Sequence, residues 1–326
     1  LTAYLTGHRA SGIIISRSMN DSSSIVFLPI YDLRVNMDNS GTTNKLRLIA
    51  LITPLVITSC GGSSASKMDS ELRNSLLFYA SYDSSTTADY AKGDPVLYNA
   101  PSRVQLDAAS HNLNFATSVK LVADNGKYGG ALEFKDNLIP VVFYKAEKNV
   151  NFQPQNWSGT ISFWLKVDPD QDLSKSYVDP IQITETGHRD AAIWADFTPT
   201  NKKRMFRLGV SGDEIYWSSD DKDIATKGFY HRVRGILNPP FSGDVWTHVA
   251  ITHDKLGSGN GSAKLYLNGI LAVTHSPIKD PFTWEYNNAN IYLGLRYSGL
   301  IDELVIFDRE ISATEVNYIY KNNINQ

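Results

Sequence analysis

The chain has only one cysteine, Cys60, in 326 residues, so no disulfide can form within it. Its formal net charge is −3, and a charge so close to balance gives no electrostatic reason to expect binding to nucleic acid or to an anionic membrane surface. The sequence also lacks a Gly-rich phosphate loop, a Cys/His zinc spacing and a Gly-x-Ser-x-Gly elbow. The chemistries most easily recognised from sequence are therefore absent.

A long hydrophobic run is missing as well. The apolar segment Leu48–Ile57 follows the basic residues Lys45 and Arg47 and is too short to span a bilayer as a mature helix. It ends in Ile57-Thr58-Ser59-Cys60, which resembles a bacterial lipobox. The resemblance implies cleavage before Cys60 and diacylglycerol on its thiol. We therefore expect a bacterial cell-envelope protein that contacts the membrane through its lipid anchor only, and Gly61 after the cysteine favours the outer membrane.

This interpretation divides the chain into four parts. Residues 1–36 have no consistent period and are interpreted as an upstream extension, with translation starting at Met37; the alternative is a real, disordered segment. Residues 37–59 are the predicted lipoprotein signal peptide. Residues 60–75 are a Gly/Ser-rich segment, predicted to be a flexible tether. Residues 76–322 are predicted to form one domain.

What the chain has in quantity is short strand-like runs. Hydrophobic residues make up 42% of it and aromatic residues 11%, and runs of 4–8 residues follow one another without a long helical period, which is typical of a β-sandwich. Asn268-Gly269 between two apolar runs predicts a tight hairpin. Ser312 and Glu315 form a capping box that predicts one short C-terminal helix. Strands are also predicted at Glu214–Trp217 and Gly228–Ile236, with a loop between them.

Four strand motifs in order, followed by the capping box, carry a family resemblance: Trp246–Thr252, Lys264–Val273, Ile291–Gly294 and Gly299–Asp308. The segments Thr160–Leu165 and Tyr128–Phe134 add to it. Together they resemble the LamG-like jellyroll family of the concanavalin A-like lectin/glucanase superfamily. The resemblance implies an all-β, antiparallel β-sandwich of jelly-roll type. It also implies that the first and last strands are neighbours.

The same resemblance implies a structural calcium ion where those two strands meet. Asp83 ends the predicted first strand and Asp302 lies in the last one, and the turn Asp124–Gly129 could add backbone carbonyls to a set of oxygen ligands. The alternative is that both carboxylates accept local hydrogen bonds. Glu303 follows Asp302 directly, so on a regular strand it is expected to point to the opposite face.

Aromatic residues in loops beside predicted strands are candidates for a carbohydrate-binding surface. Arginines on the strand at 228–236 could neutralise an acidic sugar, or could simply form a solvated strand face. The candidates are Trp217, Tyr230, Arg232, Arg234, Phe241 and Trp284. Trp164, Trp194 and Trp246 lie within alternating strands and are predicted to be core residues.

Two enzymatic alternatives were weighed against binding. Retaining glucanases on this fold need two carboxylates roughly 5 Å apart, and their E-x-D-x-E and E-x-D-x-x-E spacings are absent. The segment Pro180–Thr184 resembles the Q-I-H motif of jelly-roll alginate lyases, with Thr184 in place of the histidine base. His188, His231 and Tyr216 are other possible bases.

The sequence therefore favours a lipid-anchored binding module for a polysaccharide or glycoprotein ligand, without catalysis and without nucleic acid. A polysaccharide lyase or glycoside hydrolase is the first alternative. A structural adhesion or assembly protein is the second.

Overall fold

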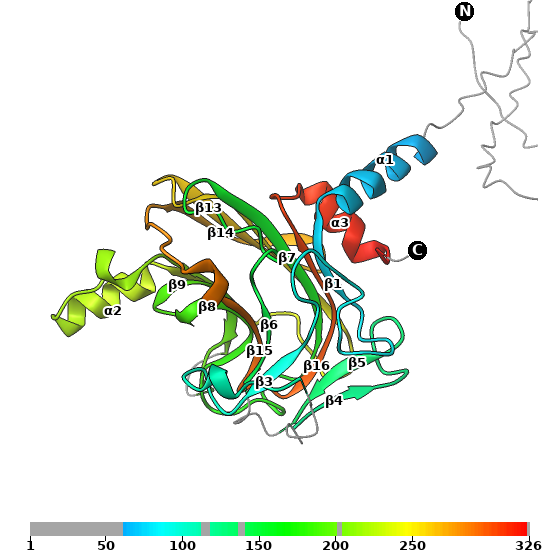
Figure 1. Cartoon of the computed structure of the whole chain (residues 1–326), viewed down its shortest axis with the longest axis horizontal. Coiled ribbons are helices and arrows are strands. Elements are labelled where there is room, and N and C mark those ends of the chain that lie inside the picture. Colours follow the sequence, from blue (N-terminus) through cyan, green and yellow to red (C-terminus); the bar gives the residue numbers. More distant parts are fainter. Residues whose placement is uncertain (1–60, 112–117, 136–140, 201–203, 325–326) are drawn as a thin grey trace, which may run out of the picture. The chain divides into compact units, whose positions relative to one another are not determined.

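The computed structural model describes residues 61–324, except 112–117, 136–140 and 201–203. These residues form two antiparallel β-sheets packed face to face, with a few short helices (Figure 1). The predicted β-sandwich is confirmed. The predictions for 1–36, 37–59 and Cys60 lie outside the described residues.

The first sheet, sheet A, has nine strands within the described residues. They are β1 (Leu76–Ala80), β2 (Tyr90–Ala91), β4 (Val119–Val122), β5 (Ala131–Phe134), β7 (Trp157–Lys166), β12 (Thr247–Leu256), β13 (Gly261–Leu267), β14 (Ile270–Ile278) and β16 (Gly299–Phe307). Their order is β14-β13-β12-β7-β16-β1-β2, and β5 pairs with both β16 and β4. The first and last strands, β1 and β16, are therefore neighbours, as expected.

Sheet B has seven strands in the described part of the chain. They are β3 (Tyr98–Ala100), β6 (Val141–Lys145), β8 (Val178–Gly187), β9 (Asp190–Phe197), β10 (Met205–Ser211), β11 (Val233–Leu237) and β15 (Asn290–Leu295). Their order is β11-β10-β9-β8-β15-β6-β3. Along each strand, every second side chain enters the main hydrophobic core, as Ile193 of β9 and Leu208 of β10 do. The side chains that alternate with these face outward.

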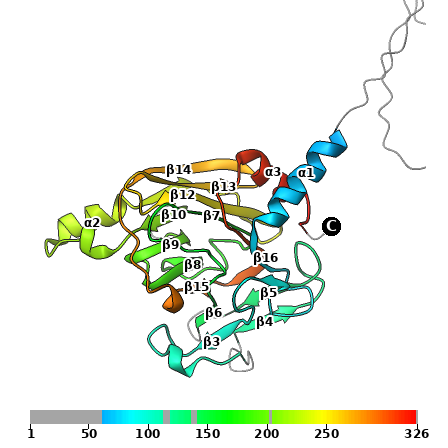
Figure 2. The ribbon, with the colours of Figure 1, turned by 45° about the horizontal axis from the view of Figure 1, so that its top comes forward.

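Three α-helices and three short 3₁₀ helices complete the described residues. They are α1 (Gly61–Asn74), α2 (Lys222–Tyr230), α3 (Ala313–Lys321), η1 (Leu106–Ala108), η3 (Glu214–Tyr216) and η4 (Tyr286–Asn288). Helices α1 and α3 lie beside each other, and α3 lies next to β14 (Figures 1 and 2). Leu72 of α1 and Val316 of α3 share a buried cluster with Tyr79 and Phe307, so these helices cover part of the outer face of sheet A. No helix of the described segments has the length and apolar character needed to cross a bilayer.

Two local predictions are confirmed in detail. Asn268 and Gly269 both have positive φ, +50° and +77°, the backbone that a type I′ hairpin turn requires. Ser312 is the N-cap of α3, and its side chain and that of Glu315 each accept a hydrogen bond from the other's backbone N–H.

The predicted flexible tether at 60–75 is wrong for most of its length, because α1 spans Gly61–Asn74. Gly/Ser composition favours flexibility, but Leu72 is only 1% exposed, and its burial against sheet A stabilises the helix. An ion pair between Arg73 and Asp69, one turn apart, adds a small contribution.

The predicted strands around α2 are also partly wrong. Residues Glu214–Tyr216 form η3 rather than a strand, and α2 covers the start of the predicted strand at 228–236, so that β11 begins only at Val233. The helix-starting signal is Asp221, whose side chain accepts hydrogen bonds from the N–H groups of Asp223 and Ile224. This cap starts a helix in the polar stretch between 217 and 228 that was predicted to be a loop.

Candidate functional site

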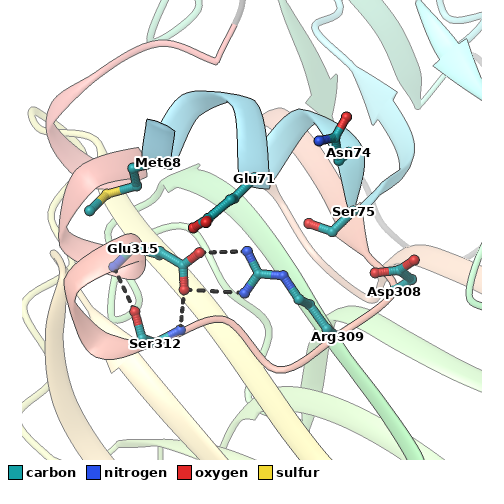
Figure 3. A pocket seen from close by; sticks show the side chains of 8 residues that line it. All are labelled: Met68, Glu71, Asn74, Ser75, Asp308, Arg309, Ser312 and Glu315. Atoms are coloured by element: carbon teal, nitrogen blue, oxygen red, sulfur yellow. Dashed lines mark hydrogen bonds and ion pairs between the residues drawn. The ribbon is translucent and has the colours of Figure 1, made fainter. Parts of the chain in front are cut away.

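A hollow of about 580 Å³ lies between α1, the end of β16 and the start of α3. Figure 3 shows Arg309 and Ser312 both directed at the carboxylate of Glu315. Arg309 Nη1 lies 3.2 Å from Glu315 Oε2, and the N–H of Ser312 donates to the same oxygen at 2.7 Å. These polar groups satisfy one another, so we interpret the hollow as a structural junction rather than a binding site.

A second cavity, of about 420 Å³, is lined mainly by residues of and beside sheet B and is bordered by Val119 and Phe134 of β4 and β5; we call it the sheet B cavity. Its volume falls within the range of small-ligand sites in proteins. Charged side chains are unusually frequent in its wall. They are Arg103, Lys135, Asp179, Asp196, Arg207 and Arg296.

A buried ion pair forms part of the cavity wall. Asp196 of β9 and Arg207 of β10 are directly opposite each other in the antiparallel register. Arg207 donates from Nε to Asp196 Oδ1 at 2.6 Å and from Nη2 to Oδ2, and the two side chains are only 7% and 4% exposed. Trp194 Nε1 also donates to Asp196, at 3.2 Å. This bidentate geometry fixes both groups in place.

Asp179 of β8 lies in a different electrostatic situation. Burial, and then the charge of Asp196, raise the pKa of Asp179 well above its ordinary value. Gln182 Nε2 donates to Asp179 Oδ2 at 3.1 Å, and Gln182 Oε1 accepts from Arg103 Nη1. Gln182 therefore links a carboxyl group that favours its neutral form to a guanidinium group.

Aromatic rings also line the cavity. The Tyr177 ring is 45% exposed and lies 4.7 Å from the guanidinium carbon of Arg207. Trp194 and Phe229 stack with centroids 6.1 Å apart, and His188 contacts the edge of both rings. Burial, and then the charge of Arg103, lower the pKa of His188, so its imidazole is neutral near pH 7.

The predicted calcium ligands lie on the other sheet, where β16 changes its edge partner. Leu304 to Phe307 of β16 pair with β1, and Gly299 to Ile301 pair with β5. Between them the register against β7 shifts, and Glu303 has a φ of +52°. Ile301 and Leu304 both enter the core, so the bulge contains one extra residue. The expectation that Glu303 points away from Asp302 is therefore wrong: the bulge turns both side chains to the outer face.

Backbone N–H groups satisfy much of this acidic junction. Asp302 Oδ2 accepts from Lys127 N at 2.6 Å, and Asp83 Oδ1 accepts from Gly130 N at 3.0 Å. The turn predicted to supply carbonyls thus supplies N–H donors. Glu303 Oε2 accepts from the Tyr79 hydroxyl at 2.9 Å. We refer to Asp83, Asp302 and Glu303 as the acidic junction.

The junction retains features that suit a cation. Burial raises the pKa of Asp302 to about 7; burial, and then the charge of Asp302, raise that of Glu303 to about 8. Glu303 Oε1 is buried and has no hydrogen-bond partner among the described residues. Gly129 at φ +57° makes room for the Asp83 carboxylate, because a Cβ there would collide with it. These oxygen donors fit calcium, although the described residues hold no pre-arranged cluster of three or more His, Cys, Asp or Glu ligands. Calcium remains a prediction.

Three of the loop aromatics predicted for carbohydrate binding serve in packing. Trp217 is 8% exposed and donates from Nε1 to the Gly212 carbonyl. Phe241 packs against Phe197 and Phe206. Trp284 is 7% exposed and contacts Trp157. Their rings offer little surface to a sugar.

The remaining three candidates lie at or near α2. Tyr230 is 53% exposed at the end of the helix and contributes to the raised pKa of Tyr177, so it lies near one residue of the sheet B cavity without lining the cavity itself. Arg232 forms two hydrogen bonds of 2.6 Å with Asp280. Arg234 donates to the carbonyls of the chain between Tyr230 and Val233. Asp280 thus neutralises Arg232 within the fold. In the part of the chain that the structure describes, Arg103 and Arg296 of the sheet B cavity have no such ion pair.

Sequence reasoning missed most of the cavity. Asp196 and Arg207 could have been noticed as charged residues at outward positions of strands that are otherwise apolar, since Ile193, Ala195 and Phe197 alternate with Trp194 and Asp196. Arg103 lies between β3 and η1, where no sequence pattern indicates its position against β8.

Comparison with known proteins assigns the family. The model of the concanavalin A-like lectin/glucanases superfamily matches residues 144–317, more than half of the chain. The chain belongs to this superfamily, as its motifs indicated.

Similarity to individual proteins is more distant. Over 132 residues the chain is 30% identical to botulinum neurotoxin type E of Clostridium botulinum and 27% identical to that of Clostridium butyricum. The matches cover 37% of this chain and 10% of each toxin, so the chain spans about a tenth of the length of these curated relatives.

Solved structures of related shape include domain 4 of an extracellular arabinanase from Geobacillus stearothermophilus, in complex with arabinotriose. It is 18% identical, with a TM-score of 0.48, over 75% of this chain and 98% of that one. Another is the binding domain of botulinum neurotoxin serotype D, 12% identical with a TM-score of 0.48, over 78% and 52% of the two chains.

Proposed function

We propose that this chain is a binding module of the bacterial cell envelope that recognises carbohydrate in the sheet B cavity and does no chemistry on it. The observation that carries the proposal is the cavity itself: about 420 Å³, with the partly exposed Tyr177 ring beside fixed, charged hydrogen-bonding groups. Sugar sites combine such an aromatic surface with a few directed polar groups.

A glycan array with the purified chain tests this proposal. Tyr177→Ala should weaken binding to any hit at least several-fold, because the ring would no longer pack on the sugar. Tyr90→Ala is a matched control, since Tyr90 is 44% exposed against 45% for Tyr177 but lies on β2 of the other sheet. An array without hits, or equal losses in the two variants, would contradict the proposal.

The membrane attachment proposed for this module is the lipidated Cys60 at the end of its lipobox-like segment. In a bacterial host, a clickable palmitate analogue should label the wild-type chain and leave Cys60→Ala unlabelled. Fractionation of the labelled chain into the outer membrane would support the proposed location. Equal labelling of both chains would exclude this anchor.

A structural calcium ion at the acidic junction is part of the same proposal. Asp83 and Asp302 would hold it, with Glu303 as a further oxygen donor, and the ion would neutralise their mutual repulsion. Its role would be to join the β1 end of the domain to β16.

Polysaccharide lyase activity is a second candidate, favoured by one observation. His188, a possible base from its residue type, lies in the sheet B cavity with Arg103 and Arg207. A neutral imidazole could remove the proton α to a carboxylate that an arginine neutralises. An increase in ultraviolet absorbance from unsaturated uronate, lost in His188→Ala, would support this activity over simple binding.

A further inference from the structure

The sheet B cavity is positively charged, although the chain as a whole is acidic. Among the described residues, four cationic side chains, Arg103, Lys135, Arg207 and Arg296, line it against two carboxyl groups, Asp179 and Asp196. The full chain carries a formal charge of −3. The cationic excess is therefore local to this cavity.

Two of the four cations already have partners. Arg207 is paired with Asp196, and Lys135 Nζ lies 3.3 Å from Glu133 Oε1. Within the described segments, Arg103 and Arg296 form no ion pair with a carboxylate. Their charges act on Asp179, whose burial favours its neutral form. Among the described residues, these two guanidinium groups thus lie beside the cavity without a paired carboxylate.

Arg103 is held in place by neutral groups. It donates to the side-chain carbonyl of Gln182, and its guanidinium carbon lies 5.6 Å from the centre of the Tyr292 ring. Arg232 provides the contrast, because Asp280 neutralises it with two hydrogen bonds of 2.6 Å. Orienting Arg103 without neutralising it leaves its charge available to an anionic ligand.

We propose that the glycan bound in the sheet B cavity is acidic, and that Arg103 and Arg296 bind its carboxylate or sulfate group while the sugar ring packs on Tyr177. This inference rests on the proposed carbohydrate-binding function. Guanidinium groups match both anions, because their planar N–H donors can bind two oxygens at once. The shared chemistry is therefore an anionic substituent on a sugar.

A glycan array that carries acidic oligosaccharides beside their neutral forms tests the inference on the full chain. Uronates are paired with their carboxyl-reduced forms, and sulfated glycans with their desulfated forms. The acidic member of a pair should bind roughly 10–100-fold more tightly, the range expected for hydrogen bonds to a charged group. Whether the preference follows uronate or sulfate identifies the anion.

Two variants assign that preference to residues. Arg103→Gln and Arg296→Gln should each remove most of the preference for the acidic form over its neutral partner. Arg296 is exposed, so its variant is expected to fold even where Arg103→Gln does not. Arg73→Gln, on α1, is the control for a general loss of charge and should behave as wild type.

The outcomes separate the two proposals. Equal affinity for acidic and neutral forms would overturn the acidic-ligand inference and leave carbohydrate binding in place. A preference retained in folded Arg103→Gln and in Arg296→Gln would overturn the assignment to these residues. Binding to no glycan of either kind would overturn both the inference and the proposed function.

Discussion

The outer faces of the two sheets differ in the groups that contact their charged side chains. On sheet A, the acidic junction receives hydrogen bonds from the backbone N–H groups of Lys127 and Gly130, and α1 and α3 cover the neighbouring surface. On sheet B, the arginines line an open cavity, and Arg103 is held only by a neutral amide and an aromatic ring.

This difference helps to distinguish structural charge from functional charge. Backbone N–H groups of the loops beside the bulge satisfy oxygens of Asp302 and Asp83, and the Tyr79 hydroxyl satisfies one oxygen of Glu303. No described residue compensates Arg103 in the same way. A charge that the fold orients without neutralising is a candidate for ligand binding, and the predictions below test whether the two faces really differ in this respect.

The largest expected effect is the loss of the buried ion pair between Asp196 and Arg207 in the wall of the sheet B cavity. Arg207→Met should leave the buried Asp196 carboxylate without its ion-pair partner and with the Trp194 N–H bond alone, so the free energy of unfolding should fall by roughly 3–5 kcal/mol. Arg232→Met is the matched control: its pair with Asp280 is more exposed, 15% and 11% against 7% and 4%, and should lose less. Urea unfolding measures both. An equal or smaller loss for Arg207→Met would show that the cavity wall tolerates an unpaired carboxylate.

The next prediction concerns calcium binding at the acidic junction on sheet A. If the acidic junction binds calcium, a chelator should lower the melting temperature, and calcium should restore it more than magnesium does, because the site is irregular and rich in oxygen. At a hundredfold excess over Kd the stabilisation would be about 2.7 kcal/mol.

Two variants test where that calcium response originates. Asp302→Ala should abolish it, and Asp83→Asn, at an exposed position, should weaken it. The exposed Asp107→Ala should leave it intact. A melting curve indifferent to chelator, with no metal in elemental analysis, would reduce the junction to its hydrogen-bonding role.

The free-energy cost of ionising Glu303 within the acidic junction can be measured without metal. The folded-state pKa of Glu303, about 8, lies above its unfolded value of about 4.3. The folded protein therefore holds a proton that the unfolded chain releases. This stabilising contribution is complete below about pH 4 and is lost as the pH rises through about 8.

Glu303→Gln cannot ionise, so in chelator its stabilising effect should be greater by roughly 1–2 kcal/mol at about pH 6 than at about pH 5. Thermal melting at the two pH values gives the comparison. The exposed Glu147→Gln is the control and should show no such pH dependence. The same change in stability at both pH values would mean that Glu303 is not held in its neutral form.

The two faces also differ in how far sequence could predict them. The hairpin at Asn268-Gly269 and the cap at Ser312 follow from local rules, and the pairing of β1 with β16 follows from the family motifs. The orientation of Glu303 could not be predicted from the sequence. A bulge changes the face of the sheet to which a side chain points, and it leaves no mark in the residue pattern.

The sheet B cavity was harder still to foresee. It brings Arg103 from a loop against Gln182, 79 positions away, and such a contact depends on tertiary packing that no local period encodes. For this reason the sequence did not indicate the arginines of the cavity as binding residues. Arg232, a candidate because of its place on a predicted strand, is instead neutralised by Asp280.

The smallest expected effect concerns the helical cover of sheet A. Ser312 Oγ accepts from Glu315 N at 3.2 Å, and Glu315 also binds Arg309. Ser312→Ala should therefore lower the free energy of unfolding by about 0.5–2 kcal/mol, whereas Ser312→Thr, which keeps the hydroxyl, should lose less, and Thr314→Ala, at an exposed position of the first turn, should change little. Because α3 buries Val316 and Ile319 against sheet A, the loss should appear as faster hydrogen exchange in α3 and leave the affinity of the sheet B cavity unchanged. If Ser312→Ala weakened ligand binding in that cavity, the two faces would be coupled, and the separation between a structural face and a binding face would not hold.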